Sequence, residues 1–276
     1  MNTLPLLVLS LAALFGTTQS RLQTDIEYGK TGGVRLLLDA SVPEGPGPFP
    51  IAIIIHGGGW DSGDKQHGIT GLFEPLTRAH FSWFSINYRL APQHRYPASS
   101  EDVQQAIRWI SANAARFRGD PQRIALIGYS AGGHLATFAA VRAAPGTSVA
   151  AVVGLAAPTD LLADAERRGE LSTSMKHLFD RQVFDDETRK ILHDASPINY
   201  VKPNLPPVLL IHGTADKSVP YAQSQNFQAR LKSAGVSCEL ITIESASHNI
   251  SEWERLDPNY KEKMVAWLAR TLGRTE

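Results

Sequence analysis

The chain has 276 residues, which is enough for one large α/β domain that buries its own core without a disulfide or a structural metal. Its 27 basic and 27 acidic residues balance, so there is no electrostatic reason to expect nucleic acid or an acidic membrane surface as a partner. The single cysteine, Cys238, excludes an intrachain disulfide, and its apolar, strand-like surroundings favour a buried, unreactive thiol.

The first twenty residues differ from the rest of the chain. An apolar stretch from Leu4 to Phe15 is followed by small residues and then by Arg21. This stretch is too short to span a bilayer and is typical of a cleaved secretory signal. We therefore expect residues 1–20 to be a signal peptide of a secreted or periplasmic protein with no stable membrane insertion. The alternative is an uncleaved amphipathic arm or a short buried helix.

The strands come next in chain order. Two short runs at 25–29 and 34–39 flank a glycine turn and predict a hairpin. A continuous β-branched run at 51–55 then predicts a strand that is buried on both faces, because it lacks polar alternation. Five similar runs follow, at 81–88, 123–128, 149–155, 208–212 and 239–243.

Helical patterns alternate with these strands, at 101–115, 132–144, 221–234 and 260–272. The alternation predicts a single α/β domain over 21–276, with a mostly parallel sheet and helices on both faces. One segment, 161–195, is longer and more charged than a simple crossover. We expect it to form a small helical, cap-like insertion over the carboxyl edge of the sheet. The alternative is one ordinary crossover helix with a long loop.

Ser130 is the predicted nucleophile. It lies in Gly128-Tyr-Ser-Ala-Gly132, between a predicted buried strand and a helix of small residues. A serine in that position needs a sharp, strained turn, and glycines two residues before and after it leave room for the turn. The hydroxyl is then exposed at the end of the strand. The alternative is a serine that merely caps the helix.

A serine hydroxyl needs a general base, and a base needs an acid that fixes its tautomer. His248 follows the last predicted strand, at the same carboxyl edge as Ser130, and is the predicted base. Asp216 follows the preceding strand and is the predicted acid, with Asp160 as a rival because it also follows a strand. The order Ser, Asp, His is that of α/β-hydrolases.

Acyl transfer also requires donors for the developing oxyanion. Three glycines follow the strand at 51–55 directly, and they have no side chains to block a carbonyl group. We predict that the N–H groups of Gly58, Gly59 and Ala131 form the oxyanion hole. The alternative is a flexible glycine loop.

Two aromatic side chains flank the predicted chemistry and are candidates for substrate binding, Trp60 and Tyr129. Core packing is the alternative for both. Two further histidines lie near the predicted site. We expect His134 to lie along the surface of the helix after Ser130, and His212 to be a packed turn residue rather than a base.

The motifs His-Gly-Gly-Gly-Trp at 56–60 and Gly-Tyr-Ser-Ala-Gly-Gly-His at 128–134 resemble those of hormone-sensitive-lipase-like esterases. They resemble still more closely the small secreted carbohydrate and feruloyl esterase-like branch of the α/β-hydrolase superfamily. Segments 87–92, 158–161 and 195–198 match further recurrent family segments, and the resemblance covers about residues 25 to 273. One departure is the amino-terminal cap of hormone-sensitive-lipase-like enzymes, in whose place this chain has a short hairpin.

The resemblance implies the α/β-hydrolase fold and a cofactor-free, metal-free carboxylesterase with a Ser-His-Asp triad and an acyl-enzyme. Its expected substrate is a small-molecule or carbohydrate ester, with a short acyl group or with the acyl group on a sugar or aryl alcohol. Two alternatives stay open. One is an amide-type, arylformamidase-like hydrolase, and the other is a non-catalytic small-molecule-binding protein on this fold.

Overall fold

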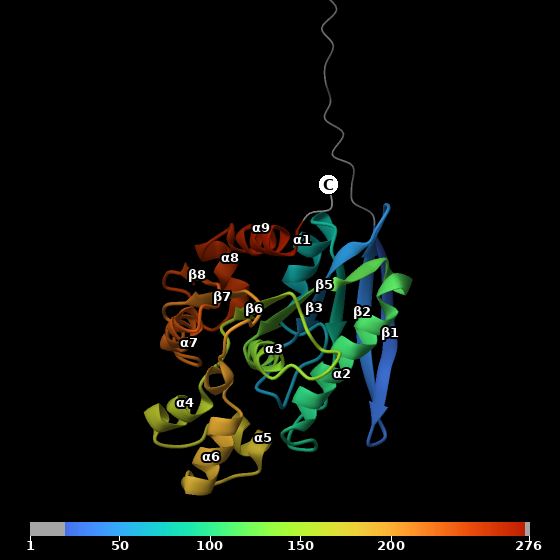
Figure 1. Cartoon of the computed structure of the whole chain (residues 1–276). Coiled ribbons are helices and arrows are strands. Elements are labelled where there is room, and N and C mark those ends of the chain that lie inside the picture. The colour runs from blue at the N-terminus through green and yellow to red at the C-terminus, as the bar shows by residue number, and fades with distance from the viewer. Residues whose placement is uncertain (1–19, 274–276) are drawn as a thin grey trace, which may run out of the picture.

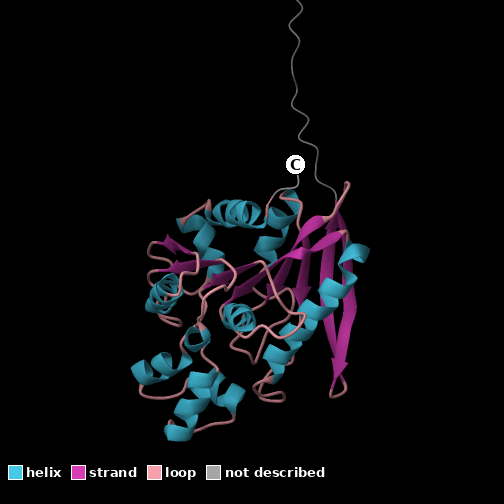
Figure 2. Ribbon diagram, viewed as in Figure 1, coloured by secondary structure: helices cyan, strands magenta, loops and turns pink. Residues whose placement is uncertain are grey.

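An eight-stranded sheet runs through the centre of the protein, with helices on both of its faces (Figures 1 and 2). The structure is a computed structural model that describes residues 20–273. The predicted signal peptide therefore lies outside the described residues, apart from Ser20.

The sheet has the spatial order β1 (Ser20–Thr31), β2 (Val34–Pro43), β4 (Ser82–Ile86), β3 (Phe49–Ile55), β5 (Gly119–Tyr129), β6 (Ala151–Leu155), β7 (Val208–Gly213) and β8 (Cys238–Ile243). The pairs β1–β2 and β2–β4 are antiparallel, and every other neighbouring pair is parallel. This arrangement confirms the predicted α/β-hydrolase fold with a mostly parallel sheet. The parallel strands from β4 to β8 all end at one edge, where loops can bring distant residues together.

The hairpin of β1 and β2 is longer than the sequence predicts. Its turn is made by Gly32 and Gly33, which have φ values of +56° and +83°. Most of β1 is exposed, so its side chains carry no hydrophobic alternation that would reveal a strand. The strand exists because its backbone pairs with β2 along almost its whole length.

Two layers of helices cover the sheet and bury separate apolar clusters. One layer contains α2 (Ala98–Asn113), α3 (Ala131–Val141) and α7 (Ala222–Ser233). The other contains α1 (Phe73–Arg78), α8 (Trp253–Leu256) and α9 (Tyr260–Leu272). Strand β3 supplies both clusters, because Ile53 and Ile55 point to the first and Ala52 and Ile54 to the second. The part of the chain that the structure describes also contains four short 3₁₀ turns, η1 (Thr70–Leu72), η2 (Ala114–Phe117), η3 (Pro197–Tyr200) and η4 (Ile250–Glu252).

The segment at 161–195 forms three short helices rather than one. These are α4 (Leu161–Arg168), α5 (Thr173–Phe179) and α6 (Asp186–Asp194), which lie together at the lower edge of Figure 1. Each helix begins with a capping side chain, those of Asp160, Ser172 and Asp185, that accepts a hydrogen bond from a backbone N–H in the first turn. Local capping therefore divides the segment, and its apolar side chains join the core on the α3 face.

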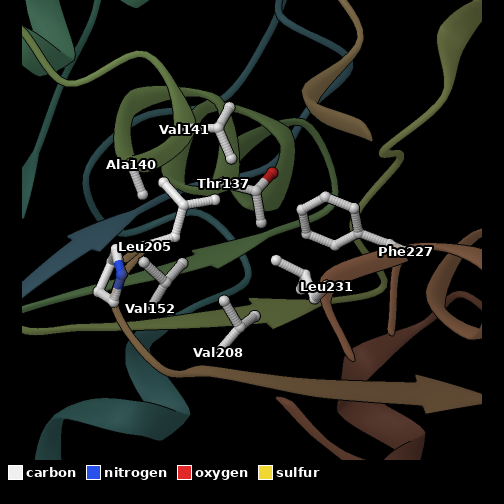
Figure 3. A pocket seen from close by; sticks show the side chains of 9 residues that line it. Thr137, Ala140, Val141, Val152, Leu205, Val208, Phe227 and Leu231 are labelled. Carbon is white, nitrogen blue, oxygen red and sulfur yellow. The ribbon is translucent and has the colours of Figure 1, made fainter. Parts of the chain in front are cut away.

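A small apolar cavity lies between α3, α7 and the sheet (Figure 3). It measures about 10 Å³, which is at the lower limit for one water molecule, and its lining is apolar. Val152 and Val208 contribute to it from the amino ends of β6 and β7, so it lies away from the carboxyl edge of the sheet. It is a packing defect rather than a substrate site.

No helix among the described residues is long and apolar enough to cross a membrane.

Candidate active site

The carboxyl ends of three parallel strands bring Ser130, Asp216 and His248 together. Strand β5 leads directly into Ser130, while Asp216 and His248 lie in the loops that follow β7 and β8. The His248 Nε2 atom lies 2.9 Å from Ser130 Oγ, and His248 Nδ1 lies 2.7 Å from Asp216 Oδ2. One imidazole thus connects a hydroxyl group to a carboxylate, an arrangement that can remove a proton from the hydroxyl group.

The turn at Ser130 is strained and is enforced by close backbone contacts. Ser130 has a φ of +53°, in the left-handed region that residues other than glycine rarely adopt. A Cβ atom on Gly128 would lie 2.0 Å from the carbonyl oxygen of Gly132, and one on Gly132 would lie 2.1 Å from that of Ile55. Only glycine fits at both positions, so β5 and α3 can approach closely enough to force the turn.

The Asp216 carboxylate is fully buried and accepts four hydrogen bonds. Its Oδ1 atom accepts from the backbone N–H groups of Ser218 and Val219, each at 2.9 Å. Its Oδ2 atom accepts from His248 Nδ1 and, at 3.2 Å, from His212 Nε2. Burial favours a higher pKa for Asp216, but the hydrogen bonds from His212 and His248 outweigh it and hold this pKa well below its usual range. The carboxylate is therefore ionised and fixed in direction.

The His248 loop is held in place by hydrogen bonds that its backbone carbonyl groups accept. The Tyr129 hydroxyl donates a 2.6 Å hydrogen bond to the carbonyl group of His248. The Ala215 N–H donates to the carbonyl group of Ala246 at 3.0 Å. A Cβ atom on Gly213 would lie 2.3 Å from that same oxygen, so the two loops pack closely only because residue 213 is glycine. His248 itself keeps 23% of its side chain exposed and can reach a substrate.

The glycine loop after β3 adopts an unusual backbone. Gly58, Gly59 and Trp60 have φ values of +101°, +59° and +62°. The Gly58 carbonyl group accepts hydrogen bonds from the N–H groups of Asp61 and Ser62, which close the loop into a tight turn. The two glycines adopt these angles without steric cost, whereas Trp60 is strained there, and such strain persists only where the surroundings hold it.

This loop lies beside Ser130. A Cβ atom on Gly57 would lie 3.3 Å from the Cβ atom of Ser130, so the glycine loop and the nucleophile turn are in contact. The N–H groups of Gly58, Gly59 and Ala131 have no backbone acceptor among residues 20–273. Ala131 is the first residue of α3, where the aligned peptide dipoles favour a negative charge. These three groups are available to bind an oxyanion.

The two aromatic candidates for substrate binding both make internal contacts. Trp60 is only 5% exposed, and its indole N–H donates a 3.2 Å hydrogen bond to His134 Nδ1. His134 Nε2 donates in turn to the carbonyl group of Ala195 at 2.8 Å. His134 is thus buried, not spread along the helix surface as the sequence suggests, and burial lowers its pKa to about 4. Substrate contact by Trp60 and Tyr129 stays a prediction.

The helical segment at 161–195 contacts the site at two places that the sequence does not reveal. Ser174 lies against the glycine loop, since a Cβ atom on Gly59 would lie 2.4 Å from its hydroxyl oxygen. The His177 Nδ1 atom lies 2.8 Å from an Asp61 carboxylate oxygen. At the other side of the site, the Arg168 guanidinium donates to the carbonyl group of Ser218 at 2.7 Å. No local motif marks these contacts, because each joins segments that are far apart in the chain.

Other candidate groups lie elsewhere. The rival acid Asp160 accepts a hydrogen bond from the Ala163 N–H and caps α4. Cys238 is buried, and burial raises the pKa of its thiol to about 12, so it is not a nucleophile at neutral pH. In the described part of the chain, no three histidine, cysteine, aspartate or glutamate side chains are grouped to hold a metal ion.

Comparison with known proteins gives matches over most of the chain. The family model BD-FAE matches residues 38–231. Esterase LipQ of Mycobacterium tuberculosis (strain ATCC 25618 / H37Rv) is 36% identical over 224 residues, which are 77% of this chain and 53% of that protein. The chain spans about half the length of several of the curated relatives that it matches.

Solved structures match the whole fold. A truncated carbohydrate esterase from gut microbiota superposes with a TM-score of 0.81 at 27% identity, covering 93% of this chain and 98% of that one. The Est2 esterase of Thermogutta terrifontis, in a propionate-bound structure, superposes with a TM-score of 0.71 at 25% identity, covering 95% of each chain.

Proposed function

The chain belongs to the BD-FAE family, and we propose that it is a serine carboxylic ester hydrolase that works through Ser130, His248 and Asp216. The matches to esterases confirm the expected resemblance to carbohydrate and hormone-sensitive-lipase-like esterases. The observation that carries the proposal is the position of His248, 2.9 Å from the Ser130 hydroxyl and 2.7 Å from the Asp216 carboxylate.

In the proposed reaction, Ser130 Oγ attacks the ester carbonyl carbon while His248 Nε2 takes the hydroxyl proton. The ionised Asp216 holds the proton on His248 Nδ1 and stabilises the imidazolium that forms. The tetrahedral intermediate collapses, the alcohol leaves with the proton from His248, and an acyl-enzyme remains on Ser130. Water then attacks the acyl-enzyme by the same sequence of proton transfers, which releases the acid.

The oxyanion of the intermediate is bound, in this proposal, by the N–H groups of Gly58, Gly59 and Ala131. Support comes from the contact between the glycine loop and Ser130, and from the lack of backbone acceptors for these donors among the described residues. Donors that are fixed before the reaction stabilise the transition state without reorganisation, and each is worth about 3 kcal/mol of barrier.

The proposed substrates are esters with short acyl groups, or acyl groups carried by a sugar or an aryl alcohol. Two structural neighbours support this class, since one is a carbohydrate esterase and the other was solved with propionate bound. No cofactor is needed for the proposed chemistry, because the chain's own groups supply the nucleophile, the base and the oxyanion donors.

The test is a hydrolysis panel of p-nitrophenyl acetate, butyrate and octanoate with methyl ferulate. Wild type is compared with Ser130→Ala and with Ser233→Ala, which removes an exposed hydroxyl group at the end of α7. We expect wild type and Ser233→Ala to cleave the short esters, and Ser130→Ala to be inactive. If folded wild type cleaves no ester, the esterase proposal fails, and an amide substrate or a binding role takes its place.

A further inference from the structure

A second histidine contacts the Asp216 carboxylate. His212 lies near the end of β7, and its side chain and that of Asp216 are both fully buried. Its Nε2 atom lies 3.2 Å from Asp216 Oδ2 and 3.0 Å from the carbonyl oxygen of Val219. Both neighbours can only accept a hydrogen bond, so His212 Nε2 carries a proton and donates it toward both.

The other ring nitrogen of His212 has a partner on α7. The His212 Nδ1 atom lies 2.7 Å from the hydroxyl oxygen of Ser224, which is also fully buried. In the neutral ring, Nε2 holds the only proton, so Nδ1 accepts a hydrogen bond from the Ser224 hydroxyl group. The acceptors at Nε2 set this tautomer, and the Ser224 hydroxyl group, which can donate or accept, holds the other side of the ring in place.

The two oxygens of Asp216 are held in different ways. Oδ1 is fixed by two backbone N–H groups, those of Ser218 and Val219. Among residues 20–273, Oδ2 is hydrogen-bonded only to His248 and His212. His248 is partly exposed and depends on Asp216 for its own orientation, so it cannot by itself hold Oδ2 in place. His212 is thus the buried group that holds Oδ2 in place independently of His248.

We propose that His212 is a positioning residue that holds Asp216 Oδ2 toward His248, and that Ser224 holds the His212 ring in the orientation this requires. The chain of contacts then runs from Ser224 through His212, Asp216 and His248 to Ser130. This inference rests on the proposed function and extends it, because it assigns a role to two residues outside the three reacting groups.

The test compares four variants in steady-state hydrolysis of p-nitrophenyl acetate, with thermal unfolding measured in parallel. His212→Leu removes the donor, and His212→Gln offers an amide N–H close to the Nε2 position. Ser224→Ala removes the hydroxyl group that binds the other ring nitrogen of His212. Ser82→Ala is the matched control, since it also removes a fully buried hydroxyl group, one that donates to the Phe117 carbonyl group at the amino end of β4.

We expect His212→Leu to lower kcat by about 10- to 100-fold with KM within about threefold, as for the loss of one hydrogen bond to a charged group. His212→Gln should regain part of that loss. Ser224→Ala should lower kcat by about two- to tenfold, and Ser82→Ala should leave kcat unchanged.

A folded His212→Leu protein with wild-type kcat would overturn the inference. If His212→Leu does not fold, Ser224→Ala decides, and a kcat equal to that of Ser82→Ala overturns the role of Ser224 and His212. A wild-type protein that cleaves no ester refutes the proposed function instead, so the two failures are distinguishable.

Discussion

Replacing Asp216 by asparagine would reverse the direction of one hydrogen bond at the centre of the site. The asparagine carbonyl oxygen would keep the two backbone N–H donors that now bind Oδ1. Its NH₂ group would then occupy the place of Oδ2 and face both His248 Nδ1 and His212 Nε2. Two donors cannot bond to each other, so His248 must change tautomer and present Nε2–H to Ser130. The imidazole could no longer accept the hydroxyl proton.

The expected loss in kcat is about 10⁴-fold, which corresponds to a barrier about 5 kcal/mol higher. The assay is hydrolysis of p-nitrophenyl acetate under saturating substrate, with thermal unfolding to show that the protein is folded. Asp160→Asn is the matched control, because asparagine also caps a helix well and should leave activity unchanged. A folded Asp216→Asn protein that keeps more than about a tenth of wild-type kcat would refute the reasoning.

Three further predictions concern other parts of the chain. Trp60→Phe removes the indole donor to His134 and should lower kcat by about two- to tenfold. The control Trp83→Phe loses a similar hydrogen bond, to Thr77, and should leave kcat unchanged. Equal kcat values for the two variants would contradict this prediction. Burial lowers the pKa of both His56 and His134 to about 4, so below about pH 6.5 the unfolded chain binds protons that the folded chain does not. The free energy of unfolding in urea should therefore fall as pH drops from 6.5 toward 4, and a constant value would contradict the burial argument. If residues 1–20 are a cleaved signal, mass spectrometry of the natively expressed protein should show a mature start near Arg21, and an intact Met1 would contradict the signal peptide.

Much of the fold could be predicted because its central strands are buried on both faces. Continuous apolar runs such as 51–55 and 208–212 are visible in the sequence, and they correspond to β3 and β7. The outer strand β1 extends well beyond its predicted run, because it is mostly exposed and its strand character comes from pairing with β2. Helix α1 is missing from the sequence prediction, since six residues are too few to show a helical period.

The sequence by itself determined which loops carry Ser130, Asp216 and His248, because each follows a recognisable strand and the carboxyl ends of parallel strands share one edge. Only the tertiary structure decided what surrounds those residues. The hydrogen bond from Trp60 to His134 spans 74 residues, and the contact between His177 and Asp61 spans 116. Such partners are chosen by side-chain packing across distant segments, which no local pattern of residues records. For the same reason, the sequence predicts only a packed turn residue at His212, although in the folded chain this histidine contacts the Asp216 carboxylate.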